Sequence, residues 1–126
     1  GDGELQEGQV WEAVRTTPRQ HLTNVTAIID RNQLKAMDLA QSSKNMDTLV
    51  ERFQSFGWAA KEIDGHSIEE ICNALDWTDC NADHPSVIVA NTIKGKGVSF
   101  FENNAFYHNA PVPPDQHEKA LAELSK

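Results

Sequence analysis

The chain contains Val25-Thr26-Ala27-Ile28-Ile29-Asp30-Arg31-Asn32, an apolar and β-branched run that stops in three polar residues. Branched side chains favour strands, and a continuous apolar run is typical of a strand that is buried on both faces. The run therefore predicts a buried strand over residues 25–29 that leads directly into a polar turn.

Two further runs predict strands of the same sheet, at residues 58–63 and 86–90. Apolar residues at helical spacing predict helices between and beside the strands. The predicted helices cover residues 8–15, 46–56, 67–75 and 115–124. Apolar strands that alternate with helices predict an α/β fold, a parallel sheet with flanking helices. In such sheets, ligands bind at the carboxyl ends of the strands.

Local signals predict where these elements begin and end. The Thr-Thr-Pro sequence at residues 16–18 is expected to end the first helix, and Gly57 the second. Ser67-Ile68-Glu69-Glu70 has the form of a capping box that begins the third helix. Residues 34–45 and 94–114 are predicted loops, and a loop as long as the second usually carries function.

Composition narrows the classes of partner. The chain has 126 residues, enough for one domain, and a formal net charge of -8. Such an acidic chain repels phosphate backbones and anionic lipids, so neither nucleic acid nor a membrane is an expected partner. Its two cysteines, Cys72 and Cys80, lack the spacing of a zinc site or a disulfide framework and suit a cytoplasmic location. An anionic ligand would need a cation or a cluster of donors.

Polar residues that suit a metal-bound diphosphate occur at two places before residue 35. Gly1-Asp2-Gly3 opens a helical stretch, where glycines permit a close approach and free N–H groups face a phosphate. Asp2 would repel that phosphate unless it held a metal ion. Magnesium prefers oxygen ligands such as the Asp2 carboxylate, the Asn32 amide and the Leu34 carbonyl. Each motif alone is a common turn, but with a helix and a buried strand between them they predict a magnesium-diphosphate site.

The order of these motifs resembles that of thiamine-diphosphate enzymes, in which Gly-Asp-Gly is followed later by an asparagine. The first thirteen residues resemble the transketolase version of this motif rather than the pyruvate dehydrogenase one. The resemblance extends along nearly the whole chain and is nearest to the amino-terminal subunit of split transketolases. It is carried by residues 1–13, 22–24, 27–32, 56–58, 64–67, 92–97 and 107–111.

The resemblance implies thiamine diphosphate as cofactor, bound through Mg (or Ca or Mn). It implies that Asp2, Asn32 and the Leu34 carbonyl bind the metal, and that Gly1 and Gly3 lie beside the diphosphate.

The resemblance also implies roles for residues outside the metal site. His108 matches a catalytic histidine near the cofactor diphosphate and the donor substrate. Lys94 matches a basic residue that lines the same region, and Glu7 matches a glutamate at a subunit contact. Without the resemblance, His108 would be a solvated loop histidine and Lys94-Gly95-Lys96-Gly97 a basic turn. The remaining histidines, His66 included, are expected to have structural or surface roles.

In the family, a strand, a helix and several substrate histidines precede the Gly-Asp-Gly motif, and another domain or chain supplies a catalytic glutamate. Residues 1–126 are therefore expected to form the C-terminal part of a thiamine-diphosphate-binding (PP-type) domain. The expected partners are a pyrimidine-binding domain or C-terminal transketolase subunit, a homo-oligomer of the assembled enzyme, and sugar phosphate substrates.

The resemblance implies transfer of a two-carbon ketol unit from a ketose phosphate to an aldose. One alternative is another thiamine-diphosphate enzyme, such as a deoxyxylulose-phosphate synthase, although the Glu-Gly-x-x-Trp-Glu-Ala sequence at residues 7–13 speaks against it. A second alternative is a non-catalytic assembly or dimerisation module with exposed strand edges.

Overall fold

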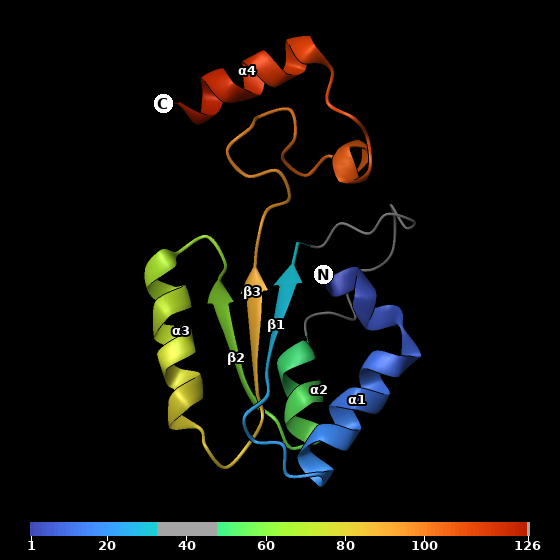
Figure 1. Cartoon of the computed structure of the whole chain (residues 1–126), viewed down its shortest axis with the longest axis vertical. Helices are drawn as coiled ribbons and strands as arrows, with labels where there is room; N and C mark the ends of the chain where they lie inside the picture. Colours follow the sequence, from blue (N-terminus) through green and yellow to red (C-terminus); the bar gives the residue numbers. More distant parts are fainter. Residues whose placement is uncertain (33–47, 126) are drawn as a thin grey trace.

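The computed structural model describes residues 1–32 and 48–125 of the chain. Within these ranges, β1 (Thr26–Arg31), β2 (Ala59–Asp64) and β3 (Ser86–Asn91) form a three-stranded sheet in the order β1-β3-β2. Both outer strands pair with β3 in parallel (Figure 1). The predicted parallel α/β fold is confirmed.

The three strands end level with one another. Arg31 of β1 and Asp64 of β2 both lie opposite Asn91 of β3. The residues that follow the strands therefore leave the sheet at one common edge, where ligands bind in open α/β sheets.

Helices cover both faces of the sheet. The helices α1 (Gly8–Arg19) and α2 (Leu49–Ser55) pack on one face, and α3 (Ile68–Cys80) packs on the other. A short 3-10 helix, η1 (Asp2–Gln6), precedes α1 and contacts β1. This layering explains the continuous apolar sequence of β3, since alternate residues of that strand enter two different cores.

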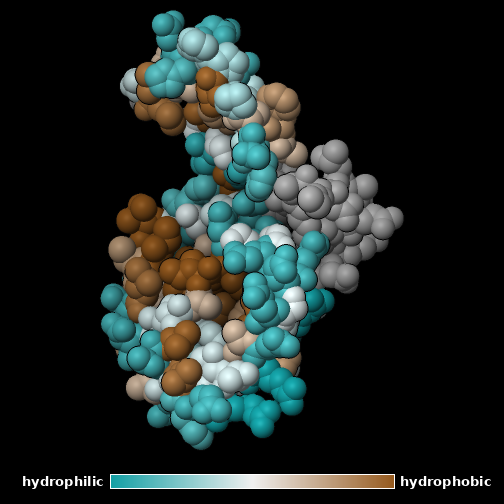
Figure 2. Space-filling view, turned by 45° about the vertical axis from the view of Figure 1, so that its right-hand side comes forward, coloured by the Kyte–Doolittle hydropathy of each residue, from teal (hydrophilic) through white to brown (hydrophobic). Residues whose placement is uncertain are grey.

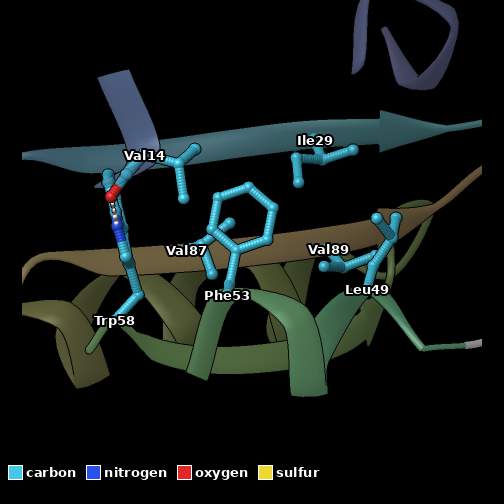
Figure 3. Close-up of a cluster of buried hydrophobic side chains, with 7 residues drawn as sticks. All are labelled: Val14, Ile29, Leu49, Phe53, Trp58, Val87 and Val89. Atoms are coloured by element: carbon cyan, nitrogen blue, oxygen red, sulfur yellow. Dashed lines mark hydrogen bonds between the residues drawn. The ribbon is translucent and has the colours of Figure 1, made fainter. Parts of the chain in front are cut away.

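The larger core lies under α1 and α2. Phe53 projects from α2 into its middle, where its ring meets the edge of the Trp58 ring with the centroids 5.6 Å apart (Figure 3). The buried members of this core are Val14, Ile29, Leu49, Phe53, Trp58, Val87 and Val89. The smaller core under α3 contains Ile63, Ala74, Ile88 and Ala90.

The prediction that residues 16–18 end the first helix is wrong, because α1 continues through Pro18 to Arg19. A proline inside a helix removes the N–H that would bond the carbonyl four residues earlier, here that of Val14. The indole Nε1 of Trp58 donates a 2.7 Å hydrogen bond to that carbonyl (Figure 3). A side chain distant in sequence thus replaces the missing donor.

Other predicted boundaries shift by smaller amounts. The strand β1 includes Asp30 and Arg31, for which the sequence predicts a turn. The helix α3 begins after its capping residue Ser67, whose hydroxyl accepts a hydrogen bond from the Glu70 N–H, as predicted, and it runs on to Cys80. The predicted loop at residues 34–45 and the predicted start of α2 at Met46 lie outside the described residues.

After β3 the chain forms a second, smaller lobe beyond the carboxyl ends of the strands (Figure 1). Its elements are a short 3-10 helix, η3 (Ala105–His108), and α4 (Pro114–Leu124). The Tyr107 hydroxyl donates to Gln116 of α4 at 2.9 Å, and the Tyr107 ring packs 4.5 Å from that of Phe101. The predicted loop at residues 94–114 is therefore ordered by contacts with α4.

No helix in the described ranges is long and apolar enough to cross a membrane.

Candidate functional site

Asp2 is a buried aspartate in η1, the short helix that contacts β1. The residue is 2% exposed, although Gly1 before it and Glu4 two residues after it are exposed. Aspartate is rarely buried to this degree unless it is paired or bound to a metal. The helix η1 that carries Asp2 contacts β1 and lies near the carboxyl end of that strand (Figure 1).

The glycines around Asp2 are not required by packing within the described residues. A Cβ atom added at Gly1 or at Gly3 would meet no atom within 4 Å. Neither glycine has the positive φ angle that favours glycine over other residues. As far as residues 1–32 and 48–125 are concerned, the space beside both glycines leaves room for a ligand to approach the backbone.

Asn32, the second predicted metal ligand, is half-buried and directly follows β1. Asp2 and Asn32 are thus carried by two elements that contact each other. Leu34, the third predicted ligand, lies outside the described residues. Among residues 1–32 and 48–125 there is no group of three or more His, Cys, Asp or Glu side chains that could hold a metal ion. One carboxylate with one amide oxygen, completed by phosphate and water, is nevertheless a donor set that suits magnesium.

Hydrogen bonds join the three strands at this edge. The Arg31 guanidinium of β1 contacts the Glu62 carboxylate of β2 at 2.9 Å. The Asn91 amide of β3 donates to the same carboxylate at 2.8 Å. The Thr92 hydroxyl donates to the Asp30 carboxylate, and the Thr92 N–H donates to the Arg31 carbonyl at 3.1 Å. The exit of β3 is therefore fixed on its β1 side.

The turn after β2 fixes the exit of β3 on its other side. The Gly65 N–H donates to the Asn91 carbonyl at 2.8 Å, and the His66 N–H donates to the Asp64 carboxylate at 2.8 Å. The second bond agrees with the expected role of His66 in supporting this turn. The ring of His66 also accepts a 2.7 Å hydrogen bond at Nε2 from the Ile93 N–H, which the sequence did not indicate.

Lys94 begins a compact turn directly after Ile93. Its side chain is half-buried, and its carbonyl accepts a 3.0 Å hydrogen bond from the Asn103 N–H. Gly95 has φ +75°, and a Cβ atom there would lie 2.6 Å from the Phe101 carbonyl oxygen. We define residues 94–97 as the basic turn. Its backbone packs against the Phe101 segment, so it has little freedom to move independently.

The remaining predicted site residues lie farther from Asp2. His108 is exposed at the end of η3 in the smaller lobe, beyond the carboxyl ends of the strands (Figure 1). Glu7 is exposed between η1 and α1. The structure therefore places Asp2, Asn32 and Lys94 on elements of one sheet edge, and His108 in the lobe beyond it.

Comparisons with known proteins agree with this arrangement. Residues 1–124 match the family model described as "Transketolase, thiamine diphosphate binding domain". Transketolase from Homo sapiens is 40% identical over 125 residues, which are 98% of this chain and 19% of that protein. The 6-deoxy-6-sulfo-D-fructose transketolase subunit SqwG of Clostridium sp. (strain MSTE9) is 36% identical over 126 residues, which are 100% of this chain and 46% of that subunit.

The fold of this chain also resembles that of transketolases of known structure. The crystal structure of transketolase from Campylobacter jejuni matches with a TM-score of 0.84 and 29% identity over 97% of this chain and 19% of that one. The chain thus spans about a fifth of the transketolases and less than half of the subunit that it matches. Since the family model covers all but the last two residues, the chain belongs to the transketolase family, in its thiamine diphosphate binding domain.

Proposed function

We propose that this chain supplies the magnesium-diphosphate part of a thiamine-diphosphate site in a transketolase-type transferase. The observation that carries the proposal is the buried Asp2 carboxylate in a glycine-flanked segment that packs against β1, the strand that leads into Asn32. Family membership supplies the cofactor class. In a chain of net charge -8, a divalent cation would also offset the repulsion between the protein and a diphosphate.

Each residue has a proposed role. The Asp2 carboxylate and the Asn32 amide oxygen bind Mg (or Ca or Mn), and the Leu34 carbonyl is the third ligand. Gly1 and Gly3 allow the diphosphate to approach the backbone. When bound, thiamine diphosphate supplies the electron sink for cleavage of a carbon–carbon bond, while the protein binds and orients it.

Two further residues are proposed to act on the anionic groups and the substrate. Lys94 provides a positive charge close to the exit of β3. His108 is proposed to donate a hydrogen bond to the cofactor diphosphate or to a hydroxyl of the donor substrate, which the imidazole ring of a loop histidine can do. Glu7 is proposed as a subunit contact, which its exposed position permits.

The proposed reaction is transfer of a two-carbon ketol unit from a ketose phosphate, or a related ketose, to an aldose. Two relatives are named for sugars of this kind, one for 6-deoxy-6-sulfo-D-fructose and one for apulose-4-phosphate. Because both relatives are named as transketolase subunits, we propose that residues 1–126 form part of a domain and that activity needs a pyrimidine-binding domain or C-terminal subunit. The assembled enzyme is proposed to be a homo-oligomer in the cytoplasm.

A non-catalytic assembly module is the second candidate, and one observation favours it. Hydrophobic side chains gather over part of the larger lobe (Figure 2). The exposed large hydrophobic residues of that lobe include Ile28 on the outer strand β1, at 62%, and Ile68 on α3, at 74%. Exposed apolar side chains on an outer strand are typical of a surface that pairs with more protein. Cofactor binding separates the two candidates, because only the first requires it.

Titration calorimetry with thiamine diphosphate, with and without magnesium, tests the proposal. We expect binding that requires magnesium. Asp2→Asn should weaken it by at least about tenfold, because even indirect partners of a metal ligand are worth 10- to 100-fold. Glu4→Gln is the matched control: it removes one charge from the same helix, but the Glu4 side chain is 73% exposed. Equal affinities for the wild type and Asp2→Asn would contradict the proposal. No binding by a chain that circular dichroism shows to be folded would exclude a cofactor site formed by this chain alone.

A further inference from the structure

The β2–α3 turn lies against the exit of β3 without intervening space. A Cβ atom on Gly65 would lie 2.5 Å from Thr92 Cγ2 and 3.0 Å from the Asn91 carbonyl oxygen. Contacts this short leave no room for a side chain, so the approach of the two segments depends on glycine at this position. The same approach places His66, the next residue, beside Ile93.

His66 binds the backbone one residue before the basic turn. The ring Nε2 of His66 accepts a hydrogen bond from the Ile93 backbone N–H at 2.7 Å. The backbone N–H of His66 donates to the Asp64 carboxylate at 2.8 Å. Accepting at Nε2 requires the neutral ring with its proton on Nδ1. The side chain thus satisfies a backbone donor at the point where the chain leaves the sheet.

Contacts continue from Ile93 into the basic turn and the smaller lobe. The Ile93 carbonyl accepts from the Lys96 N–H at 3.2 Å, and the Lys94 carbonyl accepts from the Asn103 N–H at 3.0 Å. The Gly95 backbone packs on Phe101, whose ring lies 4.5 Å from that of Tyr107, the residue before His108. A change in the backbone at Ile93 therefore reaches the segments that carry Lys94 and His108.

We infer that His66 is a positioning residue for the basic turn: through Nε2 it fixes the backbone from which Lys94 reaches an anionic ligand. The inference rests on the proposed function for its ligand, since it concerns the same thiamine-diphosphate site. Thr92, held by Asp30 and Arg31, and Ile93, held by His66, anchor the turn to β1 and to the β2–α3 turn respectively. His66 is exposed, so water competes for its bond and the expected effects are moderate.

Two substitutions separate the hydrogen bond from the bulk of the ring. His66→Phe keeps a planar ring without an acceptor, whereas His66→Gln places an amide oxygen close to the position of Nε2. We expect the Ile93 amide to exchange its hydrogen about fivefold faster in His66→Phe than in the wild type, and at nearly the wild-type rate in His66→Gln. Smaller increases are expected at Lys96, whose N–H bonds the Ile93 carbonyl. His84→Phe, at the opposite end of β3, is the matched control and should change neither.

The same proteins are titrated with thiamine diphosphate and magnesium. His66→Phe should bind about fivefold more weakly, with His66→Gln restored toward the wild type. Faster exchange in His66→Phe with unchanged affinity would overturn the positioning role, as would equal loss of affinity in both variants. If the wild type itself binds no cofactor, a cofactor site formed by this chain alone is excluded. The hydrogen-exchange rates of the Ile93 amide then decide the inference. Faster exchange in His66→Phe alone supports it, and equal rates in all the proteins overturn it.

Discussion

Gly3 illustrates what the structure adds at the scale of single residues. No described atom lies within 4 Å of a Cβ placed there, so the fold of the described residues would accept alanine. We expect Gly3→Ala to leave the free energy of unfolding unchanged or to raise it by up to ~1 kcal/mol, since alanine loses less backbone entropy on folding.

In Gly3→Ala, the affinity for thiamine diphosphate and magnesium should fall, although the free energy of unfolding does not. A methyl group that obstructs the diphosphate should cost about 1–3 kcal/mol of binding free energy, as overpacking does in protein cores. Urea unfolding and titration calorimetry on one preparation measure both quantities. Gly8→Ala is the matched control, because Gly8 also has open space around it but begins α1. Equal affinities for Gly3→Ala and Gly8→Ala would show that no ligand approaches Gly3.

Only part of the candidate site could be predicted from single residues. Asp2 and Asn32 belong to a motif with characteristic spacing, so the sequence alone indicates both. Glu62 and the ring of His66 carry no such signal, because their partners Arg31 and Ile93 come within reach only through the strand register and the β2–α3 turn. Interactions fixed by register cannot be read from local sequence.

A hydrogen bond between α1 and the residue before β2 allows α1 to continue through Pro18. The Val14 carbonyl is bonded by Trp58 Nε1, which replaces the N–H that Pro18 lacks. We expect Trp58→Phe to lower the free energy of unfolding by about 1–3 kcal/mol beyond the loss of packing, because a buried carbonyl would lose its donor.

A double-mutant cycle isolates this effect. In Pro18→Ala the new N–H at position 18 could bond the Val14 carbonyl, so Trp58→Phe should cost less in that background than in the wild type. We expect the two substitutions to be non-additive by about 0.5–1.5 kcal/mol, the net contribution of one hydrogen bond. Urea unfolding of the four proteins gives the coupling energy. Strict additivity would show that the indole does not compensate for Pro18.

Strand and helix types follow from the sequence, while several boundaries do not. The sequence predicts all three described strands, but only β3 is buried along nearly its whole length, as a continuous apolar run implies. Residues 58–63 predict β2 by alternation, and β1 alternates between buried and exposed residues, with Ile28 62% exposed. The end of α1 is predicted too early because a proline normally stops a helix, and the compensating Trp58 lies 44 residues from Val14. Asp30 and Arg31 are polar and therefore predict a turn, yet both pair with β3.

The two-lobed shape of the whole molecule could not be predicted either. The long segment after β3 contains glycines, prolines and asparagines, which indicate a loop but not its path. Contacts with α4 fix that path: Glu123 accepts from the Ser99 N–H at 2.6 Å and from the Ser99 hydroxyl at 2.8 Å. The result places η3 and His108 beyond the strand ends rather than beside the sheet (Figure 1).

This shape makes a prediction for the complete site, because a ligand at the sheet edge would face both lobes. Amide hydrogen exchange, followed with and without thiamine diphosphate and magnesium, tests it. We expect added protection in η1 (Asp2–Gln6), in the basic turn and in η3, and none at the opposite end of the sheet around His84. Protection limited to η1 would show that the diphosphate binds without the smaller lobe, and would remove His108 from the proposed site. Protection centred on α3 would place the ligand on the wrong face and contradict the site itself.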